Sequence, residues 1–369
     1  MDATGPTAQR FPLLPRPRPV CAPLTTRVEE LTELARSAVH DADTAAASAV
    51  HNRAALLASD CGLPELARTW CHRHARLYLD LVPLGGKSAR CALEPLVNLA
   101  RLQIRAGRGE AAYQLLTDLY QAVTTRTNTV IAGIELPAAA LTADDADHRQ
   151  LHRWLWSIIL AEAPRALISA GRWRDALAHL GRHHGIGHRL LDGRQVAVLA
   201  TLINGDPAAA RAVLDASTPN EPWEHAIAAC LAVLCGRTTG EAVSTMLRHQ
   251  DQLTPAPQLA VFHTRLGLSV LDGAEAANHP GVLDIAAELI QRTLANRDGY
   301  ALRDLLAHQR CAQLLTLGQA SDAHGILQQC ALGQQHLPAD LHHALTLAMD
   351  RSADFLTRAL ASSGDQALL

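Results

Sequence analysis

The sequence predicts an all-α protein made of antiparallel helix pairs. Three observations lead to this fold class. Apolar residues recur at the spacing of a one-faced helix through most of the chain, as in Leu151, Leu155 and Ile158. Glycines interrupt this pattern at short intervals, which predicts many short helices rather than a few long ones. Only 12 of the 369 residues are aromatic, which favours cores of small side chains over those of β-sandwiches and barrels.

The chain opens on a proline-rich segment, residues 1–24. Proline fixes φ and removes a hydrogen-bond donor, so six prolines within these residues predict an arm that is extended or disordered, and we expect disorder. Helical periodicity begins at Thr25 or Thr26, either of which can cap a helix. From there we expect one helical array over residues 25–361, followed by a flexible tail over residues 362–369.

One segment of this array, residues 124–147, lacks helical periodicity. Two short runs, Thr129–Ile131 and Ile134–Leu136, are separated by Ala132 and Gly133. This arrangement predicts a small β-hairpin. Inserts of this length in a compact helical array are often functional, and disorder is the common alternative.

The helical segments contain an internal repeat, Gly-x4-Ala-x3-apolar. The glycine ends one helix in a left-handed conformation, the alanine lets the next helix approach closely, and the apolar residue fills the seam between them. The copies are Gly62/Ala67/Cys71, Gly107/Ala112/Leu116, Gly171/Ala176/Leu180, Gly205/Ala210/Leu214 and Gly318/Ala323/Leu327, with Gly281/Ala286/Ile290 as a weaker one.

This repeat resembles the tetratricopeptide repeat (TPR), whose helix-turn-helix unit has the same series of Gly, Ala and a large apolar residue. Gly171 and Gly205 are 34 residues apart, which is the length of that repeat. The resemblance implies a TPR-like α-solenoid, a right-handed superhelix of stacked helix pairs. The chain departs from the TPR pattern in two ways. Its large aromatic positions hold mostly Leu, Ala or His, and no clean copy lies between Gly205 and Gly281.

Charge and composition limit the classes of partner. The formal net charge of −3 gives no basic excess for non-specific nucleic-acid binding. The longest apolar run, residues 154–163, is broken by Ser157 and Glu162 and is far shorter than a membrane span of about 20 residues. The eight cysteines form no CxxC pair, and the N-terminus has no signal-peptide pattern. We therefore expect reduced, buried thiols in a cytoplasmic protein that binds neither nucleic acid nor a membrane.

Cations are concentrated between two of the expected helices, within thirteen residues and beside glycines that let a ligand approach the backbone. About one repeat later, an aromatic residue and a histidine stand at a helix start, and elements one repeat apart lie side by side in stacked pairs. We therefore predict a groove for an anion or a peptide, a solvated loop being the alternative. Removing Arg189 and Arg194 is expected to weaken binding without lowering the melting temperature. The candidate ligand-binding residues are Arg182, His184, Arg189, Arg194, Trp223 and His225.

Three strings of the sequence are similar to a group of poorly characterised actinobacterial helical proteins. They are residues 51–62 (HNRAALLASDCG), 185–195 (GIGHRLLDGRQ) and 221–225 (EPWEH). Relatives of that group occur near phosphotransferase-like genes, including genes whose products modify ribosomally made peptides of the lanthipeptide type. The resemblance implies an accessory, substrate-engaging role in such a complex, with a kinase-like modification enzyme as partner. It assigns no catalytic residue.

These observations leave three functions open. The first is a binding module whose concave face holds a peptide or a partner protein, since no recognisable catalytic set is present. The second is a lyase that eliminates phosphate from a phosphorylated Ser or Thr, with arginines on the phosphate and an unassigned base on the α-proton. The third is a peptide sensor that regulates through another protein. We predict no cofactor and no metal, because histidine pairs such as His179 and His183 arise often in this composition.

Overall fold

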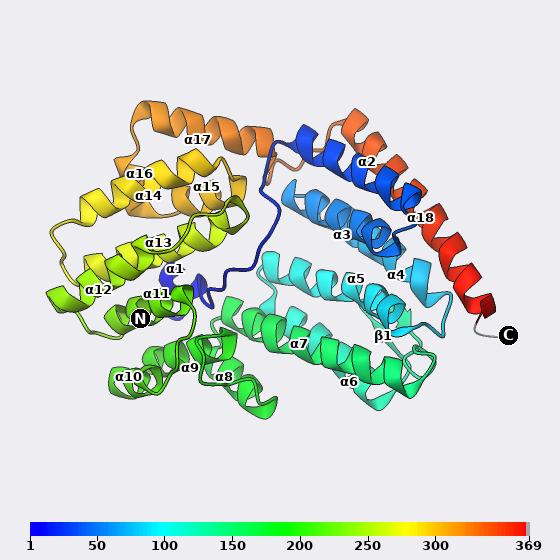
Figure 1. The fold of residues 1–369 in the computed structure, drawn as a ribbon, viewed down its shortest axis with the longest axis horizontal. Coiled ribbons are helices and arrows are strands. Elements are labelled where there is room, and N and C mark those ends of the chain that lie inside the picture. The colour runs from blue at the N-terminus through cyan, green and yellow to red at the C-terminus, as the bar shows by residue number, and fades with distance from the viewer. Residues whose placement is uncertain (367–369) are drawn as a thin grey trace. The chain divides into compact units, whose positions relative to one another are not determined.

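The computed structural model describes residues 1–366, and its fold class is all-α (Figure 1). Helices contain 72% of the residues, more than the 60% that the scarcity of strand-like runs predicts. The strands of the described part are three residues long and form one two-stranded sheet. The prediction of an all-α protein is therefore confirmed.

The chain divides into two compact units, each assembled from two separated stretches of sequence. Unit 1 comprises residues 1–22 and 167–330, and unit 2 comprises residues 23–166 and the residues from 331 onward. The sequence predicts a single array over residues 25–361. Its helical periodicity does not indicate a division into two units. The boundary at residue 166 falls inside α7.

The elements follow each other closely in both units. Those of unit 2 are α2 (Leu24–His40), α3 (Thr44–Asp60), α4 (Pro64–Leu79), α5 (Gly86–Arg105), α6 (Gly109–Thr125), β1 (Thr129–Ile131), β2 (Ile134–Leu136), α7 (Asp145–Ser169) and α18 (Ala339–Gln366). Those of unit 1 are α1 (Pro6–Gln9), α8 (Trp173–Arg182), α9 (Asp192–Ile203), α10 (Pro207–Asp215), α11 (Pro222–Leu234), α12 (Gly240–Asp251), the 3-10 turn Pro257–Leu259, α13 (Ala260–Ala276), α14 (Val282–Asn296), α15 (Gly299–Leu306), α16 (Gln309–Leu314) and α17 (Leu317–Cys330).

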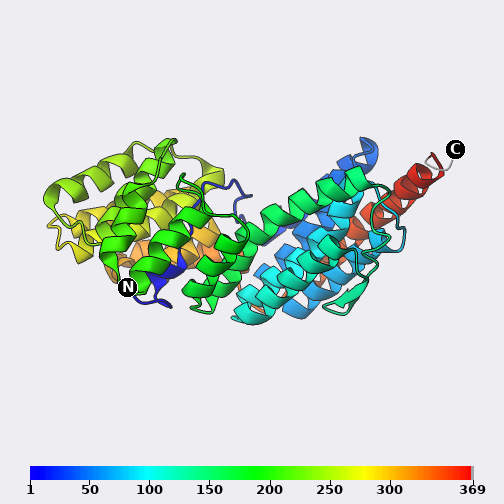
Figure 2. The same cartoon turned by 90° about the horizontal axis from the view of Figure 1, so that it is seen from below.

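Helices that follow one another along the chain pack against one another in space. In unit 2 this holds from α2 to α6, and α18 returns from the C-terminal part of the chain to pack on α2 and α3. In unit 1 the pairs α8–α9, α9–α10, α11–α12 and α13–α14 are in contact. The short connections make consecutive helices antiparallel neighbours, which lie side by side in both views (Figure 2).

The repeat alanines lie at these contacts and are completely buried. Each has no exposed surface, as a helix-helix seam of small residues requires, and the set is Ala67, Ala112, Ala176, Ala210, Ala286 and Ala323. Four of the repeat glycines adopt a positive φ of 72° to 88° directly after a helix, as predicted: Gly62, Gly107, Gly171 and Gly205. Gly281 and Gly318 do not. They stand at the start of α14 and α17, so the interpretation of these two glycines as helix ends is wrong.

The predicted β-hairpin is confirmed. Its two strands pair antiparallel with Thr129 opposite Leu136 and Ile131 opposite Ile134. Ala132 and Gly133 both have positive φ, which is the conformation of the tight turns that favour hairpins. The insert continues along unit 2, where the N–H of Leu84 donates to the carbonyl of Leu141 over 3.0 Å.

The N-terminal arm is ordered and packs within unit 1, in contrast to the disorder that its prolines predict. The side-chain amide of Gln195, which is fully buried, bonds to the backbone of Leu13 twice, accepting from its N–H over 2.7 Å and donating to its carbonyl over 2.8 Å. Asp272 of α13 accepts from Thr7, Arg10 and His308. These partners replace the hydrogen bonds that proline removes from the arm, so the segment is fixed by side chains of distant helices.

Two expectations concern the end of the chain and the membrane. The predicted flexible tail, residues 362–369, is helical as far as Gln366, because α18 continues to that residue, and residues 367–369 lie outside the described part. Among the described residues, none of the helices combines the length and the apolar character that crossing a bilayer requires.

We predict that Ala112→Leu and Ala176→Leu each lower the free energy of unfolding by about 1–3 kcal/mol. The alanines have no exposed surface, so a larger side chain has to push two helices apart. Urea unfolding followed by circular dichroism measures the change. Ala111→Leu is the matched control, because Ala111 precedes Ala112 in α6 and is exposed. Equal stability of all three variants would contradict the role assigned to the repeat.

Candidate functional site

The predicted cationic segment forms the connection between α8 and α9. Arg182 is the last residue of α8, and His184 follows with a positive φ of 53°. Both side chains are exposed. The other two predicted residues, Trp223 and His225, lie in the first turn of α11, where Trp223 is half-buried. The ring of His225 is exposed and stacks on His249 of α12, with centroids 5.8 Å apart.

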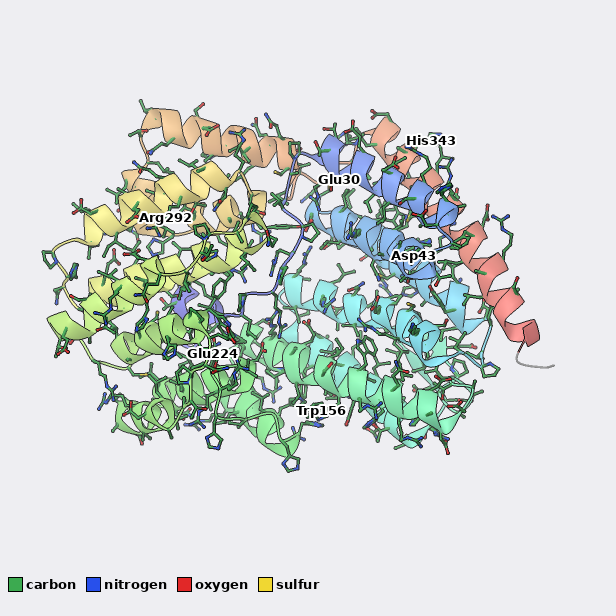
Figure 3. The ribbon with its side chains drawn as sticks, in the orientation of Figure 1. Glu30, Asp43, Trp156, Glu224, Arg292 and His343 are labelled. Carbon is green, nitrogen blue, oxygen red and sulfur yellow. The ribbon has the colours of Figure 1, made fainter. Side chains whose placement is uncertain are left out.

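The two predicted segments lie side by side, as expected. The N–H of Thr218, which precedes α11, donates to the carbonyl of His188 over 2.8 Å. Arg189 also forms an ion pair with Glu224, which projects from the first turn of α11 (Figure 3). Its neighbours Trp223 and His225 are predicted site residues, but Glu224 is not among them.

Glu224 is a fully buried carboxylate with three hydrogen bonds. It accepts from Nε of Arg189 over 3.0 Å, from a second nitrogen of the same guanidinium, and from the N–H of Leu190 over 3.0 Å. Burial by itself disfavours the charged form and would raise the pKa, but the bonds from Arg189 and Leu190 outweigh it. The pKa of Glu224 therefore lies below its ordinary value of 4.5, and the carboxylate stays charged at neutral pH.

Arg194 is also bound within the protein. Its Nε donates to the hydroxyl of Ser217 over 2.9 Å, and Nη2 donates to the carbonyl of Val213 over 2.7 Å. Arg189 and Arg194 therefore connect the α8–α9 loop to the elements that follow it. The expectation that they can be removed together without loss of stability does not fit these contacts. Ligand binding by the six predicted residues stays a prediction.

A groove of about 600 Å³ lies elsewhere, along α4 in unit 2. Three basic residues four positions apart, Arg68, His72 and Arg76, form one stripe of the helix that faces it. Leu77 and Leu81 supply apolar surface. The complete lining is Glu65, Arg68, Thr69, His72, Arg73, Arg76, Leu77, Asp80, Leu81 and Thr357, the last from α18.

The arginines of the groove differ in how they are paired. Arg73 forms an ion pair of 2.6 Å with Asp350 of α18, and Arg68 lies 3.9 Å from Glu65. Arg76 is exposed and forms no ion pair within residues 1–366. Its guanidinium is thus available to an anionic group that enters the groove.

His72 stands between the two outer arginines of the stripe. Partial burial, followed by the positive charges of Arg68 and Arg76, lowers the pKa of His72 below its ordinary value of 6.5. The imidazole is therefore neutral at pH 7. Its Nε2 is buried and has no hydrogen-bond partner within the described part of the chain. A Cβ placed on Gly133, in the hairpin turn, would lie 3.7 Å from the His72 ring, so the insert approaches this residue.

None of the predicted site residues lies in this groove. The spacing of Arg68, His72 and Arg76 is visible in the sequence, but histidines and arginines four residues apart occur repeatedly in this chain. What distinguishes the α4 stripe is that α18 and the hairpin border it, and these come from distant parts of the sequence.

A cluster of buried polar side chains, Ser48, His51 and His74, lies between α3 and α4. The rings of His51 and His74 stack with centroids 5.0 Å apart, and Nε2 of His74 is 2.9 Å from the hydroxyl of Ser48. Neither ring nitrogen of His51 has a hydrogen-bond partner. Burial, with a contribution from Arg73, lowers the pKa of His51 to about 4, and burial holds the pKa of His74 well below its ordinary value. Both imidazoles are neutral in the folded protein.

The α4 groove combines three guanidinium groups, hydroxyls and a neutral imidazole with the carboxylates of Glu65 and Asp80. The basic side chains outnumber the acidic ones, so the groove is suited to holding an anion. Across residues 1–366 no group of three or more His, Cys, Asp or Glu side chains is arranged to hold a metal ion. No family model matches the chain, and neither the curated proteins nor the solved structures compared with it give a match.

We predict that unit 2 loses stability between pH 6.5 and pH 4 because of His51 and His74. Their pKa values are depressed in the folded state, so below pH 6.5 the unfolded chain binds protons that the folded chain does not. Each histidine then lowers the free energy of unfolding by at most about 1.4 kcal/mol per pH unit. Urea unfolding at pH 7.5, 6 and 5 measures the slope. His51→Gln should flatten it, whereas His40→Gln, at an exposed position, should leave it unchanged. An unaltered slope in His51→Gln would count against this assignment.

We predict that Arg189→Ala lowers the urea midpoint of unit 1 at pH 7, because it leaves the buried Glu224 carboxylate with one donor. In the wild type, Glu224 contributes stability above pH 4.5 that is lost as the pH falls through its lowered folded pKa. In the variant, burial raises this pKa, so the deficit should shrink as the pH is lowered toward 4.5.

Two further variants test this assignment. Glu224→Gln in the Arg189→Ala background should recover part of the loss, since it removes the buried charge. Arg237→Ala, which breaks an exposed ion pair with Asp215, should change little. Equal losses in Arg189→Ala and Arg237→Ala would show that burial of Glu224 has no special role.

Proposed function

We propose that this protein is a peptide- or protein-binding helical-repeat protein, and that the α4 groove holds an acidic or phosphorylated segment of its partner. One observation carries the proposal: Arg76, which has no ion pair among the described residues, shares an open groove with Arg68 and the neutral His72. A guanidinium binds carboxylate or phosphate through paired hydrogen bonds. Leu77 and Leu81 add apolar surface for neighbouring side chains of the same segment.

The proposal extends to a TPR-like superhelix as the arrangement of the helix pairs. The support is local. The 34-residue spacing from Gly171 to Gly205 agrees with that repeat, both glycines adopt positive φ, and Ala176 and Ala210 are completely buried. Helical repeats of this kind commonly bind extended peptides along one surface.

We further propose that the protein acts in the cytoplasm as an accessory subunit that engages the substrate of a kinase-like enzyme, in a complex that modifies ribosomally made peptides of the lanthipeptide type. The support for this role is the similarity of residues 51–62, 185–195 and 221–225 to the actinobacterial helical group described above. Eight cysteines without a disulfide are consistent with a reducing compartment.

A phosphopeptide lyase is the second candidate, and the position of His72 favours it. A neutral imidazole between two arginines supplies what phosphate elimination needs. Arg68 and Arg76 would bind the phosphate of a phosphoserine or phosphothreonine, and His72, after a rotation that exposes its buried Nε2, would take the proton from Cα. The C–H electron pair then forms the Cα=Cβ double bond, and phosphate leaves with the electrons of the Cβ–O bond.

We predict that a fluorescein-labelled peptide with three Asp residues or one phosphoserine binds the protein, and that the same peptide with Asn or Ser does not. Arg76→Glu should weaken binding at least tenfold, because it reverses the charge that faces the ligand. Fluorescence anisotropy measures the dissociation constant. Arg53→Glu, an equal charge change at an exposed position of α3 in the same unit, is the matched control.

Two outcomes contradict the binding proposal: no binding of either anionic peptide, or equal weakening in Arg53→Glu and Arg76→Glu. Release of inorganic phosphate from the phosphopeptide, abolished in His72→Gln, would favour the lyase over the binding module. Binding without phosphate release favours the binding module.

A further inference from the structure

Two cysteines far apart in the sequence converge at one place in unit 1. Cys21 is the penultimate residue of its N-terminal stretch, and Cys330 is the last residue of both α17 and the unit. Neither has any exposed surface. They are separated by 309 positions along the chain, so their proximity is a property of the fold and not of local sequence.

The two sulfur atoms share a small space beside Gly299. A Cβ placed on this glycine would lie 2.8 Å from Sγ of Cys330 and 3.0 Å from Sγ of Cys21. The thiol of Cys330 donates to the carbonyl of Cys21 over 2.9 Å, and the N–H of Gly299 donates to the same oxygen over 3.0 Å. Because Gly299 has no side chain, both thiols fit into the space between the arm and the start of α15.

The backbone on both sides of this gap is fixed. The N–H of Cys21 donates to the carboxylate of Asp298 over 2.9 Å, and the same carboxylate caps α15 by accepting from the N–H of Ala301 over 2.9 Å. Asp298 is itself buried. Because the arm is held at Cys21 and α17 ends at Cys330, neither thiol has to travel far to reach the other.

We propose that Cys21 and Cys330 form an intramolecular disulfide when the protein is oxidised, and that this pair is a redox modification site. The oxidant is a low-molecular-weight disulfide. Two S–H bonds break and one S–S bond forms between the cysteines, while the two electrons and two protons pass to the oxidant, which leaves as two thiols. The bond would join the two ends of unit 1 and close a loop of about 300 residues, which restricts the unfolded chain.

The other cysteines differ from this pair in their surroundings. Burial raises the pKa of Cys71 and of Cys311 to about 12, so these thiols stay protonated at neutral pH, and what sets Cys21 and Cys330 apart is their proximity to each other rather than their burial. Neither is within 4 Å of a glycine position that it shares with a second sulfur. Cys71 is therefore a suitable control for general oxidation of buried thiols.

The test is oxidation of the full-length protein with oxidised glutathione, followed by tryptic digestion and mass spectrometry. Cys311→Ser serves as the background, because Cys311 and Cys330 fall in one tryptic peptide, residues 311–351. We expect a cross-link between that peptide and residues 11–27, a loss of two hydrogens from the intact mass, and reversal by a reducing agent. Because both thiols are buried, the reaction should proceed through local opening and be faster in a low concentration of urea.

Variants and stability give independent readouts. Cys21→Ser and Cys330→Ser should each abolish the cross-link, and Cys71→Ser should leave it intact. The oxidised protein should unfold at a higher temperature than the reduced protein, and this difference should vanish in Cys330→Ser. The proposal is overturned if glutathione adducts accumulate without the cross-link, or if cross-links between other cysteines form first.

Discussion

The close approach of neighbouring helices at alanine positions is the constraint on which both units depend. Few aromatic residues are present, and the buried cores combine leucines with many alanines, so helices come together over small side chains at the alanine positions. Ala67 and Ala112 meet this need in unit 2, and Ala176 and Ala210 do so in unit 1, each without exposed surface. The same requirement explains why the glycines that precede these helices turn the chain so sharply, since the next helix must return directly onto the last one.

Buried polar groups form hydrogen bonds that join separate elements within each unit. In unit 1, Glu224 joins the α8–α9 loop to α11, and Asp272 joins α13 to the arm and to His308. In unit 2, Ser48 supports His74 between α3 and α4. Each of these groups is satisfied by partners from other elements, so they fix which segments meet as well as how tightly they pack. His51 differs from these groups, because its ring is stacked and buried but makes no hydrogen bond within the described residues.

The features that the sequence predicts correctly are those that depend on residues close together in the chain. Helical periodicity depends on residues three and four apart, and the hairpin depends on the two-residue turn Ala132-Gly133, so both are visible locally. The repeat has no copy at the α11–α12 pair, because the residue five positions after Gly236 is Glu241 rather than an alanine, and α12 buries Val243 and Met246 instead. The ordered arm, the partner of Arg189 and the α4 groove escape prediction for a different reason. Each depends on contacts between segments far apart in the chain, such as Leu13 with Gln195, and composition around either residue alone gives no sign of the other.

The interleaving of the two units has a consequence for how the protein is made. A ribosome delivers the chain in order, at about 5–20 residues per second, and Leu13 is 182 positions ahead of Gln195. The arm must therefore wait for roughly 10–35 seconds before its partner is synthesised. Unit 2 waits longer still, since α18 packs on α2 and α3 only after the segments of unit 1 have been synthesised. Neither unit can be completed during the early part of translation, and a chain cut at residue 166 contains neither unit whole.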